Sequence, residues 1–276
     1  MRLTLTYLFI AIPLFLFSQK QAGFIDFTWQ DSTGKVMLHI PESFIDSEFL
    51  YVNSLAAGVG SNDIGLDRGQ LGDERVVRFY RSGNKMLLIE DNLTYRAVSD
   101  NKKEVAAVEE AFAKSVLFGF EIVDQADGGY NLDATPFLIR DAHGVSKRLK
   151  QRKEGAYELD KTRSAVYKEG LLNFPDNTEL EAILTFKGDS KGAEIRSVTP
   201  TSDFVSVRQH HSFVRLPDDG YTSRRFHPES GYFYGSFYDY AAPIGQDMQQ
   251  RYILRYRIEK INPQTEMRED VEPMVY

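Results

Sequence analysis

The side chains best able to bind a metal in this chain are its histidines, because it contains no cysteine. They are His39, His143, His210, His211 and His227. None of them is followed by Glu, so the sequence lacks the H-E-x-x-H helix, in which two imidazoles hold zinc beside a glutamate base. We therefore expect this chain by itself to hold no zinc or other cofactor and to hydrolyse no peptides.

His210 and His211 are adjacent in a segment that has the alternating polarity of a strand. Neighbouring side chains of a strand point to opposite faces, so the two imidazoles cannot easily share one metal ion. We expect one of them to face inward and form hydrogen bonds, and the other to face outward. They are candidate structural residues, or weak metal ligands.

Other motifs that would support catalysis or phosphate binding are incomplete. In the segment 231–235, which has the glycine spacing of a G-x-S-x-G elbow, Phe233 occupies the position of the nucleophile. In the glycine-rich segment 60–66, Leu66 stands where a phosphate-binding loop needs lysine. We interpret residues 56–72 as a mobile surface loop.

Asp133 and Asp141 flank a predicted strand that runs into a turn. With Thr135 they could bind a cation, but they lack the close spacing of a calcium loop. The alternative, which we favour, is that they cap a helix and stabilise a turn.

A block of arginines interleaved with Tyr and Phe lies near the end of the chain. It contains Arg224, Arg225, Arg251, Arg255 and Arg257. Arginine stacks on aromatic rings and pairs with carboxylates, so these residues are candidates for an interdomain interface. The alternative is an ordinary strand with arginines on its solvent side.

The segment 251–258 alternates, which predicts a strand with two distinct faces. We expect Tyr252 and Leu254 to face the core, and Arg251, Ile253 and Arg255 to face outward.

Composition indicates a globular protein rich in strands. Hydrophobic residues make up 42% of the chain and charged residues 26%, and 15 Tyr and 19 Phe favour β structure. The net charge of −7 argues against a general nucleic-acid binder.

The N-terminus has the pattern of an export signal. Arg2 precedes an apolar run, residues 3–17, which is shorter than the roughly 20 residues of a membrane span. Ser18 offers a cleavage position. We expect residues 1–18 to be a signal peptide, the mature chain to be periplasmic or extracellular, and no membrane span to remain.

The predicted fold is α+β and mostly antiparallel β, as a twisted β-sandwich or open barrel with two or three short helices. Residues 75–81 and 85–90 should form a hairpin, and residues 103–113 a helix. Residues 188–192 should form a hairpin loop that leads into a returning strand at 193–198.

Several long segments carry a resemblance to a known family. They include QHHSFVRLPDDGY, RRFHPESGYF, DYAAPIGQ and RYILRYRIEK. These segments resemble the domain of unknown function, of the DUF5117 or DUF5118 kind, that precedes the catalytic domain in bacterial secreted zinc-dependent metalloproteases.

The resemblance implies that residues 19–270 form a β-rich accessory domain, and that residues 271–276 begin a catalytic domain that this chain lacks. Zinc would then belong to that domain, and the domain itself would be the partner. The alternative is a free-standing exported module that binds peptide or glycan on its aromatic block.

Overall fold

The structure is a computed structural model that describes residues 18–218 and 220–255. The chain forms two compact units. Unit 1 comprises Met1–Glu90 and Val116–Leu216, and unit 2 comprises Asp91–Ser115 and Pro217–Tyr276. The expected signal peptide before Ser18 and the expected start of a catalytic domain lie outside the described residues.

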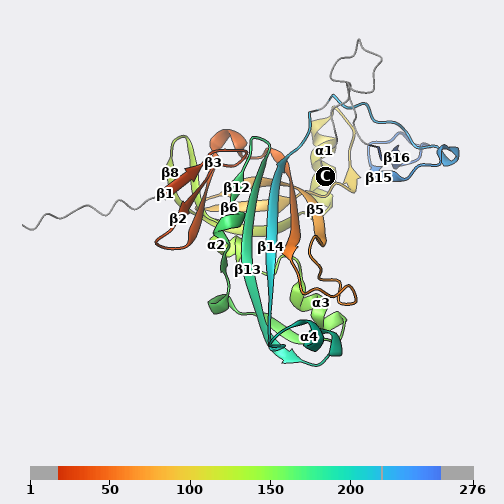
Figure 1. Cartoon of the computed structure of the whole chain (residues 1–276). Coiled ribbons are helices and arrows are strands. Elements are labelled where there is room, and N and C mark those ends of the chain that lie inside the picture. Colours follow the sequence, from red (N-terminus) through yellow and green to blue (C-terminus); the bar gives the residue numbers. More distant parts are fainter. Residues whose placement is uncertain (1–17, 219, 256–276) are drawn as a thin grey trace, which may run out of the picture. The chain divides into compact units, whose positions relative to one another are not determined.

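Unit 1 is built on one large, mostly antiparallel sheet that curls into a nearly closed barrel (Figure 1). In their order across the sheet its strands are β1 (Ser18–Gln21), β2 (Phe27–Gln30), β3 (Lys35–Pro41), β9 (Gly129–Asp133), β8 (Ser115–Ala126), β6 (Lys85–Glu90), β5 (Leu71–Ser82), β4 (Glu48–Ala57), β14 (Phe204–Arg215), β13 (Asn177–Ser190) and β10 (Gly155–Leu159). Two short strands, β11 (Ala165–Val166) and β12 (Leu172–Asn173), also pair with β13. The predicted α+β, mostly antiparallel fold is confirmed, in its open-barrel form.

Alternating sequence explains the long strands. In β13, Leu180, Ala182, Leu184 and Phe186 are all fully buried, while the residues between them face the other side of the sheet. The hairpin predicted at residues 75–90 is present as β5 and β6, in which Ser82 pairs with Lys85.

Inside the barrel, five phenylalanines form a closed ring of contacts. They are Phe49, Phe79, Phe120, Phe137 and Phe213, and each ring centroid lies 5.3–5.9 Å from the next. Aromatic pairs at this separation add to the stabilisation from burial. We call these residues the phenylalanine ring.

Side chains connect the β1 end of the sheet to β12 and β13, which lie close to its other end. Asn173 Nδ2 donates to the carbonyls of Gln21 and Ile25, at 3.0 Å each, and Ile25 N donates to Thr178 Oγ1 at 2.9 Å. A Cβ at Gly23 would overlap the Asn173 amide. These contacts hold the β1–β2 connection against β13.

The described residues contain four α-helices, where two or three were expected: α1 (Lys102–Ala111), α2 (Thr135–Leu138), α3 (Val145–Gln151) and α4 (Ala193–Val198). They also contain the short 3-10 turns η1 (Glu42–Phe44), η2 (Lys161–Arg163), η3 (Lys168–Gly170) and η4 (Pro228–Ser230).

The carboxylates of Asp133 and Asp141 lie at helix starts. Asp133 accepts the N–H of Thr135, and Asp141 accepts those of Val145 and Ser146. Both carboxylates therefore bind backbone N–H groups of a first helical turn, which is the arrangement that the capping alternative predicts.

The predicted hairpin at residues 188–198 is wrong. Strand β13 continues to Ser190, and residues 193–198 form the helix α4 instead of a returning strand. The Glu154 carboxylate accepts the N–H of Ile195 at 2.9 Å, and the Ile195 side chain is fully buried. A distant carboxylate and one buried side chain thus override the local strand pattern.

The loop at residues 56–72 is anchored, contrary to the mobile surface loop that was expected. Val59, Ile64 and Leu66 are buried in the core, and Val59 N donates to Leu66 O at 2.8 Å.

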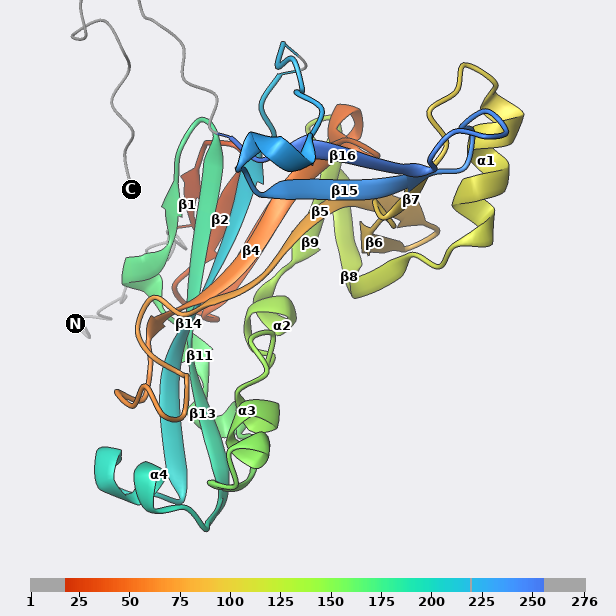
Figure 2. The ribbon, with the colours of Figure 1, turned by 90° about the vertical axis from the view of Figure 1, so that its right-hand side faces the viewer.

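Unit 2 contains a small sheet of β7 (Tyr95–Arg96), β15 (Tyr234–Asp239) and β16 (Gln249–Ile253), with β15 in the middle (Figure 2). Strand β15 is antiparallel to β16 and parallel to β7. The rings of Tyr95 and Phe112 stack with centroids 4.0 Å apart, and Tyr240 packs edge-on against Phe112. Aromatic contacts therefore join the two chain segments of this unit.

We predict that Gly192→Ala lowers the free energy of unfolding by about 1–3 kcal/mol. A Cβ at Gly192 would overlap the Glu154 carboxylate that holds the start of α4. Thermal unfolding followed by circular dichroism measures the effect. Gly119→Ala is the control, because a Cβ there meets only the end of the Leu87 side chain, at 3.3 Å. Equal stability of the two variants would show that α4 does not depend on this contact.

Candidate functional site

The arginines predicted as an interface lie in unit 2, around strand β16. Arg251 is within β16, Arg255 follows it, and Arg224 and Arg225 belong to a segment that pairs with its outer edge. Phe226 N donates to Arg251 O at 3.0 Å, and Ile253 N to Arg224 O at 2.9 Å. Arg257 lies outside the described residues.

Neutral groups hold these guanidinium groups in place. Arg225 donates to Gln250 Oε1 at 2.6 Å, Arg251 donates twice to Gln249 Oε1, and Arg255 donates to the Tyr221 hydroxyl at 2.8 Å.

Each of these three arginines also lies over an aromatic ring. The rings belong to Tyr252, Tyr234 and Tyr221, with the guanidinium carbon 5.3–5.7 Å from the ring centroid. None of the four described arginines is paired with a carboxylate among residues 18–218 and 220–255. The positive charges of Arg225, Arg251 and Arg255 are therefore oriented but not neutralised within the described chain.

The predicted faces of the final strand are wrong. Ile253, expected outside, is only 7% exposed, whereas Leu254, expected in the core, is 62% exposed. Strand β16 ends at Ile253, and the Arg251 guanidinium lies over the Tyr234 ring on the same face as Ile253, so arginine does not mark the solvent side here. Because Arg225 pairs with Tyr252, its side chain and that of Arg251 lie on opposite faces of the sheet.

Exposed apolar side chains lie beside these arginines. Phe233 is 88% exposed, Tyr232 is also exposed, and Leu254 N donates to Phe233 O at 3.0 Å, which places the two side chains at one end of the sheet. We call Tyr232, Phe233, Leu254 and the four arginines the arginine–aromatic surface, which follows the outer edge of β16 and includes side chains from both faces of the sheet. A hollow of about 440 Å³ beside it is lined by Arg225, Arg251, Phe226, Pro228, Gln246, Asp247, Gln249 and Gln250.

The two adjacent histidines point to opposite faces of β14, as predicted. His211 is completely buried, with Nδ1 2.9 Å from the Tyr51 hydroxyl and Nε2 2.9 Å from Gln209 Nε2. Burial lowers the pKa of His211 well below its ordinary value, and the charge of Arg140 lowers it further. His211 is therefore neutral.

His211 belongs to a polar network inside the barrel that sequence reasoning missed. Arg140 donates to the Tyr51 hydroxyl at 3.3 Å. The side-chain amide of Gln209 donates from Nε2 to Arg140 O and accepts the N–H of His143 at Oε1, each at 3.0 Å. These residues come from separate strands and a loop, and their spacing in the sequence gives no signal of contact. The network holds the segment after α2 against β4 and β14.

His210 faces outward between two carboxylates of β13. Its Nε2 lies 2.6 Å from Glu179 Oε2, and its Nδ1 lies 3.0 Å from Glu181 Oε1. Because carboxylates only accept, both ring nitrogens donate and the imidazole is charged. Arg208 Nε also lies 2.7 Å from Glu181, and the Arg208 guanidinium lies over the Tyr167 ring.

These contacts shift the pKa of His210 and of Glu179. Burial alone would lower the pKa of His210, but hydrogen bonds and charge from Glu179, and then from Glu181, raise it above 6.5. Burial likewise opposes the shift in Glu179, whose pKa is lowered by hydrogen bonds from His210, Ser212 and Asn177. The ring nitrogens of both histidines are thus engaged by protein groups, and the described residues contain no cluster of three or more His, Asp or Glu arranged to hold a metal.

We predict that His210→Gln lowers the free energy of unfolding by about 2 kcal/mol near pH 6. Because the pKa of His210 is raised, its charge stabilises the folded state fully at pH values below the ordinary histidine pKa, and this stabilisation is lost as the pH rises through the folded-state pKa. Because the pKa of Glu179 is lowered, its contribution is lost as the pH falls through the folded-state pKa of that carboxylate. The difference between wild type and variant should therefore peak at about pH 5–6.5 and shrink toward pH 9.

Denaturant titrations at several pH values measure this difference. His227→Gln is the matched control, because the His227 side chain is 71% exposed and 3.8 Å from Glu229. A difference for His210→Gln that does not change with pH would contradict the charged bridge.

Comparison with known proteins identifies a family for most of the chain. No curated protein and no solved structure is similar enough to this chain to count as a match. Among the described residues, no helix is both long and apolar enough to cross a membrane. Residues 69–261 match the family described as a domain of unknown function, DUF5117, and include β5 to β16 and the arginine–aromatic surface. The chain therefore belongs to the DUF5117 family.

Proposed function

We propose that this chain is the non-catalytic N-terminal region of an exported zinc-dependent metalloprotease, and that unit 2 packs against the protease domain. Membership of the DUF5117 family supports this proposal, together with the resemblance of segments such as RRFHPESGYF and RYILRYRIEK to the region before such protease domains. Zinc and its chemistry belong, in this proposal, to the partner domain.

The arginine–aromatic surface is the observation that carries the docking part of the proposal. Its guanidinium groups are held by glutamine and tyrosine, without a carboxylate among the described residues, and Phe233 and Leu254 are exposed beside them. Oriented arginines next to exposed aromatic side chains are typical of the residues that contribute most to binding at protein interfaces. Acidic and apolar groups of a neighbouring domain complement both features.

A second candidate function is a free-standing exported module that binds peptide or glycan. The exposed rings of Tyr232, Tyr234, Tyr238 and Tyr240 favour it, because aromatic faces form platforms for such ligands. The two functions differ in whether a protease domain is encoded in the same reading frame.

We predict that the reading frame containing the codon for Tyr276 continues into a segment with H-E-x-x-H. The full product should then hold zinc and cleave a protein substrate, and residues 19–276 alone should do neither. Sequencing of the gene, metal analysis and a casein assay test this. A stop codon directly after Tyr276, in an intact gene whose product is secreted, would favour the free-standing module.

We further predict that Arg255→Glu leaves the thermal stability of residues 19–276 nearly unchanged. Its guanidinium is exposed and, among the described residues, donates hydrogen bonds to Tyr221 and Thr222, and exposed substitutions usually cost about 0.5 kcal/mol or less. In the full product, the same change should speed proteolysis near Tyr276, because the new glutamate would face the acidic groups that we propose for the neighbouring domain and would repel them. Arg196→Glu, on α4 of unit 1, is the charge-matched control. Equal proteolysis of the two variants would exclude Arg255 from the contact.

A further inference from the structure

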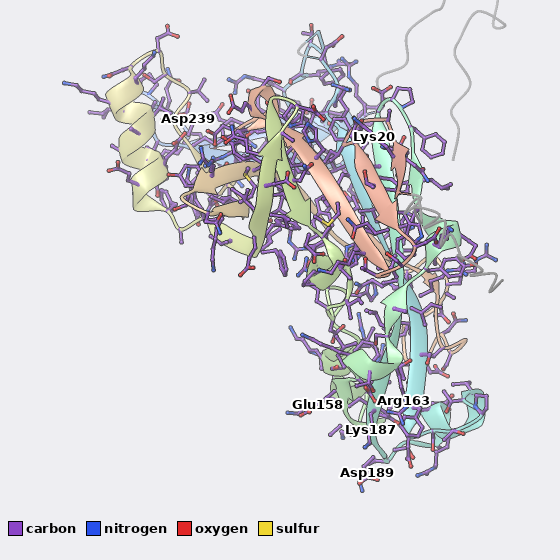
Figure 3. All side chains as sticks on the ribbon, turned by 90° about the vertical axis from the view of Figure 1, so that its left-hand side faces the viewer. Lys20, Glu158, Arg163, Lys187, Asp189 and Asp239 are labelled. Carbon is purple, nitrogen blue, oxygen red and sulfur yellow. The ribbon has the colours of Figure 1, made fainter. Side chains whose placement is uncertain are left out.

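A groove lined with lysines lies in unit 1, at the end of β13 that is near α3. It has a volume of about 680 Å³ and lies between α3, β10 and β13. Its lining residues are Ser146, Lys147, Lys150, Ala156, Tyr157, Glu158, Lys187 and Gly188. Lys187 and Glu158, labelled in Figure 3, project from the paired strands β13 and β10.

The lysines of the groove differ from many others in the same unit. Lys20, Lys35, Lys168 and Lys191 each pair with an aspartate. Lys147, Lys150 and Lys187 form no ion pair with another described residue. Glu158 is the carboxylate of the groove, so three positive charges face one negative charge in a protein of net charge −7. The groove is therefore a local site of positive potential.

The packing of α3 explains why these charges gather there. Val145 and Leu149 are fully buried, which directs this side of α3 into the core and leaves Lys147 and Lys150 exposed. Gly188 keeps β13 close to β10, because a Cβ there would overlap the Tyr157 ring and Ala156 O. The groove is thus built by the core and does not depend on the positions of flexible lysines alone.

We infer that this groove binds an extended acidic peptide segment. Lysine ammonium groups are compact charges suited to carboxylates, and these three, which form no ion pair within the described part of the chain, complement several acidic side chains. The charges of the groove come from α3, β10 and β13, so they are spread over the paired strands and the helix beside them. Charges spread in this way suit an extended chain with several acidic side chains better than a compact ion. This inference does not depend on the protease proposal, because the groove belongs to unit 1.

Fluorescence anisotropy with a labelled oligo-glutamate peptide tests the inference, with an oligo-glutamine peptide of equal length for comparison. Residues 19–276 should bind the glutamate peptide, more weakly as salt rises, and should not bind the glutamine peptide. The combined change Lys147→Glu, Lys150→Glu and Lys187→Glu should weaken binding about tenfold or more.

The matched control reverses three exposed lysines outside the groove, Lys85, Lys102 and Lys161, so that the net charge changes equally. It should leave binding nearly unchanged. The milder pair Lys147→Gln and Lys150→Gln, combined with thermal unfolding, separates lost binding from lost folding.

Several results would overturn the inference. Equal weakening by the groove and control variants would show non-specific attraction. If the glutamate peptide does not bind, the groove is not a site for acidic peptides, and the role left for its lysines is to prevent the end of the sheet from pairing with other strands. Binding of a sulfated oligosaccharide that only the groove variant abolishes, without binding of the peptide, would assign the groove to a different class of ligand.

Discussion

The phenylalanine ring is the constraint on which the rest of unit 1 depends. Strands β4, β5, β8 and β14 and the short helix α2 each contribute one side chain to it. Each ring contacts two neighbours, so removal of one would open a cavity at a cost of about 3–5 kcal/mol. Helix α2 has only four residues, and the burial of Phe137 in the ring fixes its position. The segment that follows can then deliver Arg140 to the buried Tyr51 and His211.

Two adjacent histidines show how position in this fold sets charge. His211 points into the barrel and is neutral because burial disfavours an imidazolium there. His210 points out of the barrel, toward Glu179 and Glu181, and is charged because both ring nitrogens face carboxylates. Two adjacent residues of the same type therefore have different roles, since His211 belongs to a buried polar network and His210 forms a charged bridge between strands.

Much of the fold could be predicted from local pattern, because long strands with one buried face must alternate. The hairpin at residues 75–90 and the opposite orientations of the histidine pair followed from that rule. The helix α4 did not, because Glu154, far from it in sequence, holds its first turn. The candidate interface residues were named, but their faces were assigned wrongly at Ile253 and Leu254. The Arg251 guanidinium lies over a tyrosine ring on the same strand face as the buried Ile253. The polarity of the residues alone therefore assigned the wrong face of this strand to the core.

In our proposal, the arginine–aromatic surface of unit 2 contacts another domain of the same product. Hydrogen–deuterium exchange, compared between residues 19–276 alone and the full gene product, is the direct test of this contact. We expect slower exchange in the full product for peptides that cover residues 224–226, 232–234 and 249–255, and unchanged exchange in the barrel strands β4, β13 and β14. Unchanged exchange in the unit 2 peptides, or protection confined to unit 1, would show that this surface does not contact another domain.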